Sequence, residues 1–155
     1  LLLAGLCLAG YPGPLAAARQ QYAWNCQNIN EVQVALGRWV AASAAPGAAV
    51  LVNDAGAIRY FGGHRTIDLI GLNSHEVLFD AAQQRAILTS PERMRAYMRE
   101  QRAEYLIVFP SWLADFVDFG LERHIFREVK TVHSERYTIV WPNSGQDWVV
   151  VLACY

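Results

Sequence analysis

Two carboxylates in turn sequences are the residues best suited to chemistry in this chain. Asp54 follows an apolar run at residues 48–52, and Asp68 lies between two apolar residues. Ligands of open α/β sheets gather at the carboxyl ends of strands, so Asp54 is well placed for a binding site. A structural role is the alternative, because an Asp in an Asn-Asp-x-Gly turn accepts backbone hydrogen bonds without any ligand.

The surroundings of Asp68 add two more candidates. In a strand its side chain points away from those of its sequence neighbours, so we expect it to reach solvent or to bond to His64 or Arg65. A structural role is again the competing interpretation. The candidates for contact with a sugar, a lipid phosphate or another part of the protein are Asp54, His64, Arg65 and Asp68.

Motifs of known catalytic or cofactor chemistry are missing from the sequence. It contains no G-x-G-x-x-G, no G-x-x-x-x-G-K-[ST], no G-x-S-x-G and no H-E-x-x-H. Its four histidines have no helical ligand spacing, and its three cysteines form no C-x-x-C pair. We therefore assign no catalytic residue, no metal site and no cofactor.

Strands and helices alternate in the predicted secondary structure that must hold the candidates. Apolar runs predict buried strands at residues 48–52 and 105–109, and shorter strands are expected at 57–61 and 66–69. Two apolar strands joined through helices imply a parallel pair. The predicted fold is an α/β single-domain sandwich with a mixed β-sheet flanked by helices.

Helix signals lie before and between these strands. A helix is expected to open at Asn28, with Glu31 completing an approximate capping box. Ser90 is the expected N-cap of a later helix, with Pro91 at its first position. The other expected elements are helices at 74–88, 91–103 and 112–119, a hairpin of strands 126–132 and 137–141, and a last strand at 147–153.

Aromatic side chains cluster behind the second apolar strand. They are Phe109, Trp112, Phe116 and Phe119. Such a cluster can stack on a sugar ring, but at this spacing a core strand and helix explain it better.

The segment NDAGAIRYFGGHRTIDLIGLN at residues 53–73, preceded by Gly37-Arg38-Trp39-Val40 on a helix, resembles a known family. It is similar to the extracytoplasmic C-terminal domain of bacterial polytopic GT-C class glycosyltransferases of the protein mannosyltransferase and aminoarabinose transferase type. The resemblance runs from about residue 28 to 143 and implies a polyprenyl-phosphate sugar donor. It places the catalytic acid in a membrane portion that this chain lacks, so no catalytic residue carries over.

Residues 1–10 are apolar or small throughout. A spanning helix needs about 20 apolar residues, so this segment cannot cross a bilayer alone. It is interpreted as the outer end of a transmembrane helix, the tail of a secretory signal, or a buried helix of the domain. With the resemblance, we expect residues 1–20 to be the end of a truncated transmembrane helix with a linker, and residues 21–155 to form the extracytoplasmic α/β domain.

Cys26 and Cys154 lie near opposite ends of this domain. Domain termini often lie close together, so the two thiols could pair in an oxidising compartment. Two unrelated buried thiols are the alternative.

Composition limits the function classes. The chain is 54% hydrophobic and 17% charged with a net charge of −1, which fits one globular domain and argues against nucleic-acid binding. The expected function is that of an extracytoplasmic domain of a membrane glycosyltransferase, non-catalytic on its own, whose partners are the membrane-embedded half of the same polypeptide and a lipid-linked sugar. The alternative is a free-standing exported α/β binding domain with a ligand pocket near residues 54–73.

Overall fold

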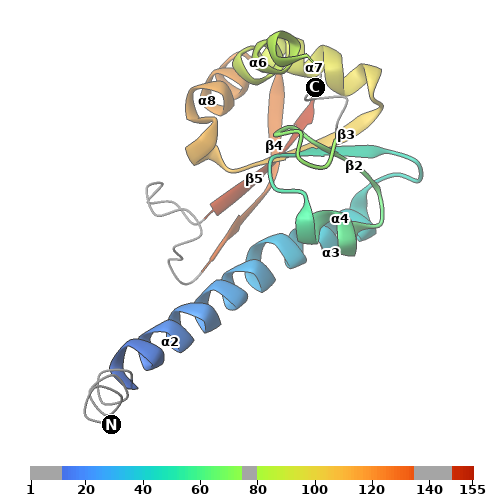
Figure 1. Cartoon of the computed structure of the whole chain (residues 1–155). Coiled ribbons are helices and arrows are strands. Elements are labelled where there is room, and N and C mark those ends of the chain that lie inside the picture. Colours follow the sequence, from blue (N-terminus) through green and yellow to red (C-terminus); the bar gives the residue numbers. More distant parts are fainter. Residues whose placement is uncertain (1–11, 75–79, 135–147) are drawn as a thin grey trace.

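The computed structural model describes residues 12–74, 80–134 and 148–155, which form one sheet with helices on both faces (Figure 1). The strands run in the order β2-β1-β3-β5-β4. Strand β1 is parallel to β2 and β3, whereas β5 is antiparallel to β3 and β4. The predicted α/β sandwich with a mixed sheet is confirmed. The strands are β1 (Ala49–Val52), β2 (Arg65–Asp68), β3 (Ala103–Val108), β4 (Phe126–His133) and β5 (Trp148–Cys154).

A long helical segment opens the described chain. Helix α2 (Pro12–Ile29), the π-helix η1 (Asn30–Val34) and α3 (Ala35–Ser43) follow one another without a break. The expected helix start at Asn28 is therefore wrong, because Asn28 is a buried residue inside the segment.

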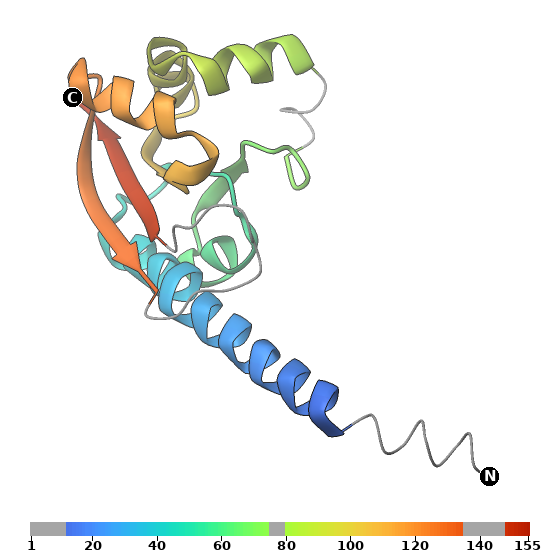
Figure 2. The same ribbon diagram turned by 90° about the vertical axis from the view of Figure 1, so that its left-hand side faces the viewer.

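Helix α2 extends away from the sheet (Figures 1 and 2). It includes residues 12–20, for which the sequence predicts a transmembrane end and linker, while residues 1–11 lie outside the described part. Among the described helices, none is both long and apolar enough to span a bilayer. The domain boundary at residue 20 stays a prediction.

A helix, not a strand, connects β1 and β2. Residues 57–61 belong to α4 (Gly56–Gly62), so the strand expected there is wrong. Ile58 and Gly62 lie one turn apart and are both buried, which is the period of a helix packed on one face. A Cβ on Gly37 of α3 would lie only 2.9 Å from Phe61 Cβ, so the glycine permits the close approach of the two helices.

The other face of the sheet carries α6 (Ala81–Thr89), α7 (Pro91–Glu100) and α8 (Ala114–Glu122), with the short 3₁₀-helix η2 (Pro110–Trp112) before α8. The predicted cap is confirmed, since Ser90 Oγ accepts a hydrogen bond from Arg93 N at 3.3 Å. Helix α6 begins later than expected, with Asp80 as its N-cap, and residues 75–79 lie outside the described part.

The predicted hairpin strand at residues 137–141 also lies outside the described part. Strand β4, the other strand of the predicted hairpin, pairs with β5.

Two apolar cores fill the spaces between the three layers. Leu51 and Leu106 point to the core under α6, α7 and α8. Val50 and Ile107 point to the core under α3 and α4. Strands buried on both faces read as continuous apolar runs, which is why β1 and β3 were recognisable in the sequence.

Candidate functional site at the carboxyl ends of the parallel strands

The chain leaves the carboxyl ends of β1 and β3 in opposite directions. The segment after β1 leads to α4 on one face, and the segment after β3 leads through η2 to α8 on the other. In open α/β sheets, ligands usually bind where the connections of neighbouring parallel strands diverge in this way. We call the residues at this point, Gln33, Asn53, Asp54 and Phe109, the switch-point cluster.

Asn53 joins the ends of β1 and β3. Its Oδ1 accepts a hydrogen bond from Phe109 N at 3.3 Å, and its own N–H donates to Ile107 O at 3.4 Å. Asn53 is only 5% exposed, yet its Nδ2 has no hydrogen-bond partner within the described residues. Sequence analysis missed Asn53, although its place directly after a buried strand is a recognisable signal.

Asp54 is held by a side chain from the N-terminal helical segment. Its Oδ2 accepts a hydrogen bond from Gln33 Nε2 at 2.9 Å. Gln33 lies in η1, where the wider π turn leaves three consecutive residues buried, Val32, Gln33 and Val34. The Oε1 of Gln33 is buried and, among the described residues, unpaired. Single π turns are often found at functional sites, and this one aims an amide at the strand edge.

Asp68 has a structural role. Its carboxylate accepts hydrogen bonds from Ile70 N at 2.9 Å, Gly71 N at 3.3 Å and Asn73 N at 3.0 Å. It is 2% exposed, and Gly71 adopts φ 92, a left-handed conformation that glycine allows. Asp68 thus has the turn role that was the alternative for Asp54, and both expectations for Asp68, solvent exposure and a bond to His64 or Arg65, are wrong.

His64 and Arg65 lie at the opposite edge of the sheet. Arg65 pairs with Ala49 at the amino end of β1, whereas Asp68 pairs with Val52 at its carboxyl end. Nδ1 of His64 lies 3.2 Å from Ala48 O. The guanidinium of Arg65 donates to the backbone oxygen of Gln101 at 2.6 Å. The structure therefore brings two of the four candidates, Asp54 and Asp68, to one edge and separates them from the other two.

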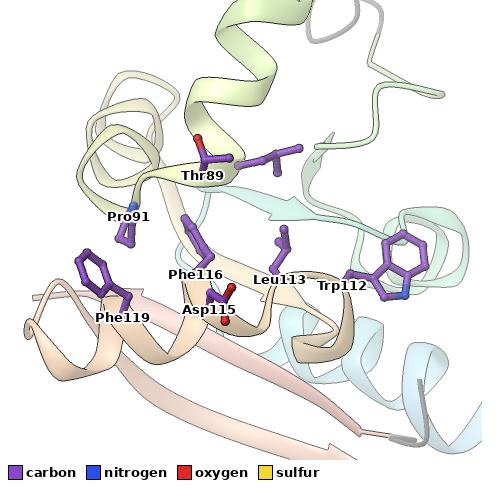
Figure 3. A pocket seen from close by; sticks show the side chains of 8 residues that line it. Thr89, Pro91, Trp112, Leu113, Asp115, Phe116 and Phe119 are labelled. Atoms are coloured by element: carbon purple, nitrogen blue, oxygen red, sulfur yellow. The ribbon is translucent and has the colours of Figure 1, made fainter. Parts of the chain in front are cut away.

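A cavity of about 570 Å³ lies on the other side of the strand ends, between the α6–α7 junction and η2–α8 (Figure 3). Trp112 borders both places, since it lines the cavity and stacks on Phe109 with 6.0 Å between ring centroids. The volume is within the range of small-molecule sites. The lining residues are Leu88, Thr89, Pro91, Trp112, Leu113, Asp115, Phe116 and Phe119.

The aromatic cluster divides between core and cavity. Phe116 is buried and packs on Phe126 at 5.8 Å between centroids, as the core interpretation predicts. Phe119 is 41% exposed, and the Arg123 guanidinium lies 3.9 Å from its ring centroid. Figure 3 shows the rings of Trp112 and Phe119 at opposite ends of the cavity, so one small ring cannot stack on both.

The two described cysteines are separate. Cys26 is exposed on α2, whereas Cys154 ends β5 with its Sγ 3.7 Å from Met98 Sδ, and both thiols are free. The expected disulfide is wrong, because β5 ends at the opposite end of the sheet from the one where α2 joins it (Figure 1). Burial raises the pKa of the Cys154 thiol, so it is a poor nucleophile at neutral pH. No cluster of three metal-ligating side chains occurs in residues 12–74, 80–134 and 148–155.

Comparison with known proteins gives a family and no activity. Residues 20–152 match the family model described as Domain of unknown function (DUF8728). The chain belongs to this family. No curated protein and no solved structure matches it. The DUF8728 match begins within α2, covers β1 to β4 and ends two residues before the end of β5, so the switch-point cluster and the cavity both lie inside the family's domain.

Proposed function

We propose that this DUF8728 chain is the extracytoplasmic domain of a membrane glycosyltransferase that uses a polyprenyl-phosphate sugar donor. In this proposal the domain is non-catalytic on its own and shapes the donor or acceptor side of the active cavity. Its partners are the membrane-embedded half of the same polypeptide and the lipid-linked sugar.

The proposal rests on the position at which the N-terminal helical segment joins the domain, which is the carboxyl end of β1. Gln33 bonds to Asp54 at the carboxyl edge of β1, and Glu31 Oε2 accepts a hydrogen bond from Ser134 Oγ at 3.0 Å at the end of β4. From this edge α3 runs back along the sheet, and α2 continues away from it (Figure 2). A membrane half preceding α2 would thus lie on the side of the switch-point cluster.

A stripe of exposed apolar side chains along α2 also supports a partner. Leu15, Tyr22 and Ile29 recur every seven residues and are 57%, 72% and 40% exposed. Side chains at this spacing lie nearly on one line of a helix, as in helices that pack against another helix. We call them the α2 stripe. The membrane-embedded half is the partner that the proposal assigns to it.

The domain is proposed to be non-catalytic because the carboxylates of Asp54 and Asp68 are already hydrogen-bonded within the protein. Asp68 is surrounded by the donors of its own loop, and Asp54 is bonded to Gln33. The two cationic or titratable candidates, His64 and Arg65, lie at the other edge of the sheet. A general acid needs to lie within hydrogen-bond reach of its substrate, and Asp68 has no such freedom.

The test compares the full-length polypeptide, the same polypeptide lacking residues 28–155, and the purified 155-residue chain. Each is given a radiolabelled polyprenyl-phosphate sugar and candidate acceptors. We expect transfer by the full-length protein, impaired transfer after the deletion although the remainder still inserts, and none by the purified chain. Transfer by the purified chain above the no-protein control, abolished by Asp54→Asn, would refute the non-catalytic role.

A free-standing exported binding domain is the second candidate, with a ligand pocket near residues 54–73. It is favoured by the unpaired amide atoms of Gln33 and Asn53 beside Asp54. The gene sequence upstream of residue 1 separates the two candidates. Several long apolar segments would support the membrane enzyme, and a short basic region before a single apolar segment would support the exported domain.

A further inference from the structure

We infer that the cavity of Figure 3 binds a primary ammonium group carried on a small aromatic body, with Asp115 as its anionic partner. This inference concerns the domain itself and depends on neither candidate function. It begins from the composition of the lining. Asp115 is the one charged residue among the eight described residues that line the cavity, and Thr89 carries the one hydroxyl group. The other six are apolar or aromatic, so the cavity suits a ligand with an apolar body and one polar group.

The negative charge of Asp115 is not balanced by another residue. In the part of the chain that the structure describes, its carboxylate makes no hydrogen bond and no ion pair. Arg123 lies beside the cavity, over the ring of Phe119, but its guanidinium is bonded to Glu92 at 3.3 Å. The positive charge of Arg123 is therefore already paired, and the Asp115 carboxylate is left to attract a cation from solution.

Both polar side chains of the lining can only accept hydrogen bonds. The Thr89 hydroxyl has a single hydrogen, which it donates to Arg85 O at 2.8 Å, so its oxygen remains as an acceptor. The ionised carboxylate of Asp115 also only accepts. An ammonium group supplies donors and a positive charge, whereas a ligand carboxylate or phosphate would supply more acceptors and a like charge.

The amino end of helix α8 is the feature that could favour an anion instead. Its N-cap residue, Leu113, offers no side-chain hydrogen bond, and the first turn of a helix carries a partial positive charge. However, Asp115 lies in this first turn, so its full negative charge outweighs the partial charge of the helix end. The cavity therefore selects a cation.

The spacing of Asp115 and Phe119 indicates the shape of the ligand. The two residues are four positions apart on α8, so their Cβ atoms lie about 5–6 Å from each other on one face of the helix. Asp115 is exposed, and Phe119 is 41% exposed even with Arg123 over its ring. An arylethylamine, in which a short alkyl chain joins an ammonium group to an aromatic ring, can bind the carboxylate and pack on the phenylalanine at once.

The experiment titrates the 155-residue chain with 2-phenylethylamine and follows the backbone amide signals by NMR. The control ligands have the same aromatic body: 2-phenylethanol carries no charge, and 3-phenylpropionate carries a negative one. At neutral pH we expect the signals of Phe116 and Phe119 to shift with the amine, to shift less with the alcohol and to stay unchanged with the carboxylate. Because Asp115 is exposed, the amine should bind only about three- to fivefold more tightly than the alcohol, and added salt should remove this difference.

Variants decide whether Asp115 and Phe119 carry the binding. Asp115→Asn should lower the affinity for the amine to that for the alcohol and leave the affinity for the alcohol unchanged. The matched control is Asp118→Asn, which changes the charge of α8 equally at an exposed residue that does not line the cavity. Phe119→Ala removes apolar surface and should weaken both ligands, so it still tests the cavity should Asp115→Asn fail to give a folded spectrum.

Three outcomes would overturn the inference. The first is the absence of shifts at Phe116 and Phe119 with the amine in the folded chain. The second is an affinity for the amine that Asp115→Asn leaves unchanged, or that Asp118→Asn lowers as much. The third is equal or tighter binding of 3-phenylpropionate, which would show that the amino end of α8, and not Asp115, determines the charge of the ligand.

Discussion

Asp68 accepts hydrogen bonds from both nitrogen atoms of Asn73. Its Oδ2 lies 3.0 Å from the Asn73 backbone N and 3.2 Å from Nδ2. Its Oδ1 serves Ile70 N and Gly71 N. One buried carboxylate thus closes the loop that follows β2 and holds it at the same edge of the sheet as the switch-point cluster.

Asp68→Asn should destabilise the domain by about 2–3 kcal/mol. The amide replaces one acceptor oxygen with an NH₂ group, which faces the loop's N–H donors, and bonds to a charged acceptor are worth more than neutral ones. The midpoint of urea unfolding, followed by circular dichroism, measures the cost.

Asp54→Asn is the matched control for Asp68→Asn. Gln33 can turn its amide to accept from the new Asn, so the hydrogen bond at this position persists and the cost should stay below about 1 kcal/mol. Equal losses for the two substitutions would contradict the conclusion that Asp68 holds its loop together whereas Asp54 only accepts one hydrogen bond from Gln33.

The sheet was predictable because its central strands are buried on both faces. Residues 48–52 and 105–109 are apolar without interruption, and in the structure they are the neighbouring strands β1 and β3. The Ser90-Pro91 start of α7 was equally clear, since an N-cap and an N1 proline are local signals. Strands that are buried on both faces and helix starts with local capping signals were thus predicted correctly from the sequence.

Features that depend on tertiary contacts were not recovered. Residues 57–61 contain β-branched and aromatic side chains that favour a strand, yet packing against Gly37 makes them helical. The hydrogen bond from Gln33 to Asp54 could not be foreseen either. It requires η1 to contact the end of β1, and the two residues are 21 positions apart in the sequence. The separation of His64 and Arg65 from Asp68 follows from the direction of β2, which composition does not encode.

Gly37→Ala should destabilise the domain by about 1–3 kcal/mol, the range for overpacked cores. The added Cβ would meet Phe61 Cβ at 2.9 Å and Ala57 O at 3.0 Å, and the second contact is backbone of α4 that cannot rotate away. Gly56→Ala is the control, since nothing lies within 4 Å of its Cβ position at the start of the same helix. It should be neutral or stabilising by up to about 1 kcal/mol. Thermal unfolding of both variants tests the packing of α3 on α4.

Alkaline pH should weaken the fold through Cys154. Burial raises the pKa of its thiol, so the folded state favours the protonated form. The stability from this group is therefore full below the ordinary thiol pKa and is lost as pH rises through the raised folded value. Urea midpoints on both sides of this window should fall more for the natural chain than for Cys154→Ala. A fall of the same size in both would assign the alkaline loss to other groups.

The same thiols should differ in reactivity. Cys26 is exposed on α2, and Cys154 is half-buried against Met98. Iodoacetamide at neutral pH should therefore modify Cys26 first, with Cys154 following only at higher pH or in denaturant. Peptide mass spectrometry assigns each site without replacing other cysteines. Recovery of a Cys26–Cys154 linked peptide from the non-reduced chain would contradict the separation of the two thiols.

The α2 stripe should matter for activity and not for stability. Leu15, Tyr22 and Ile29 are exposed on the isolated chain, so replacing all three by Gln should leave its unfolding midpoint unchanged within about 0.5 kcal/mol. In the full-length polypeptide the same replacement should lower sugar transfer, because the proposed contact with the membrane-embedded half loses its apolar surface.

Leu72→Gln is the control for the α2 stripe. Leu72 is 81% exposed in the loop after β2, so its replacement should leave the unfolding midpoint unchanged. Equal transfer by the triple variant and the natural full-length protein would remove the stripe as a contact with the membrane half. A large drop in the midpoint of the isolated chain would instead mean that these side chains stabilise the domain itself, because exposed side chains contribute little to folding.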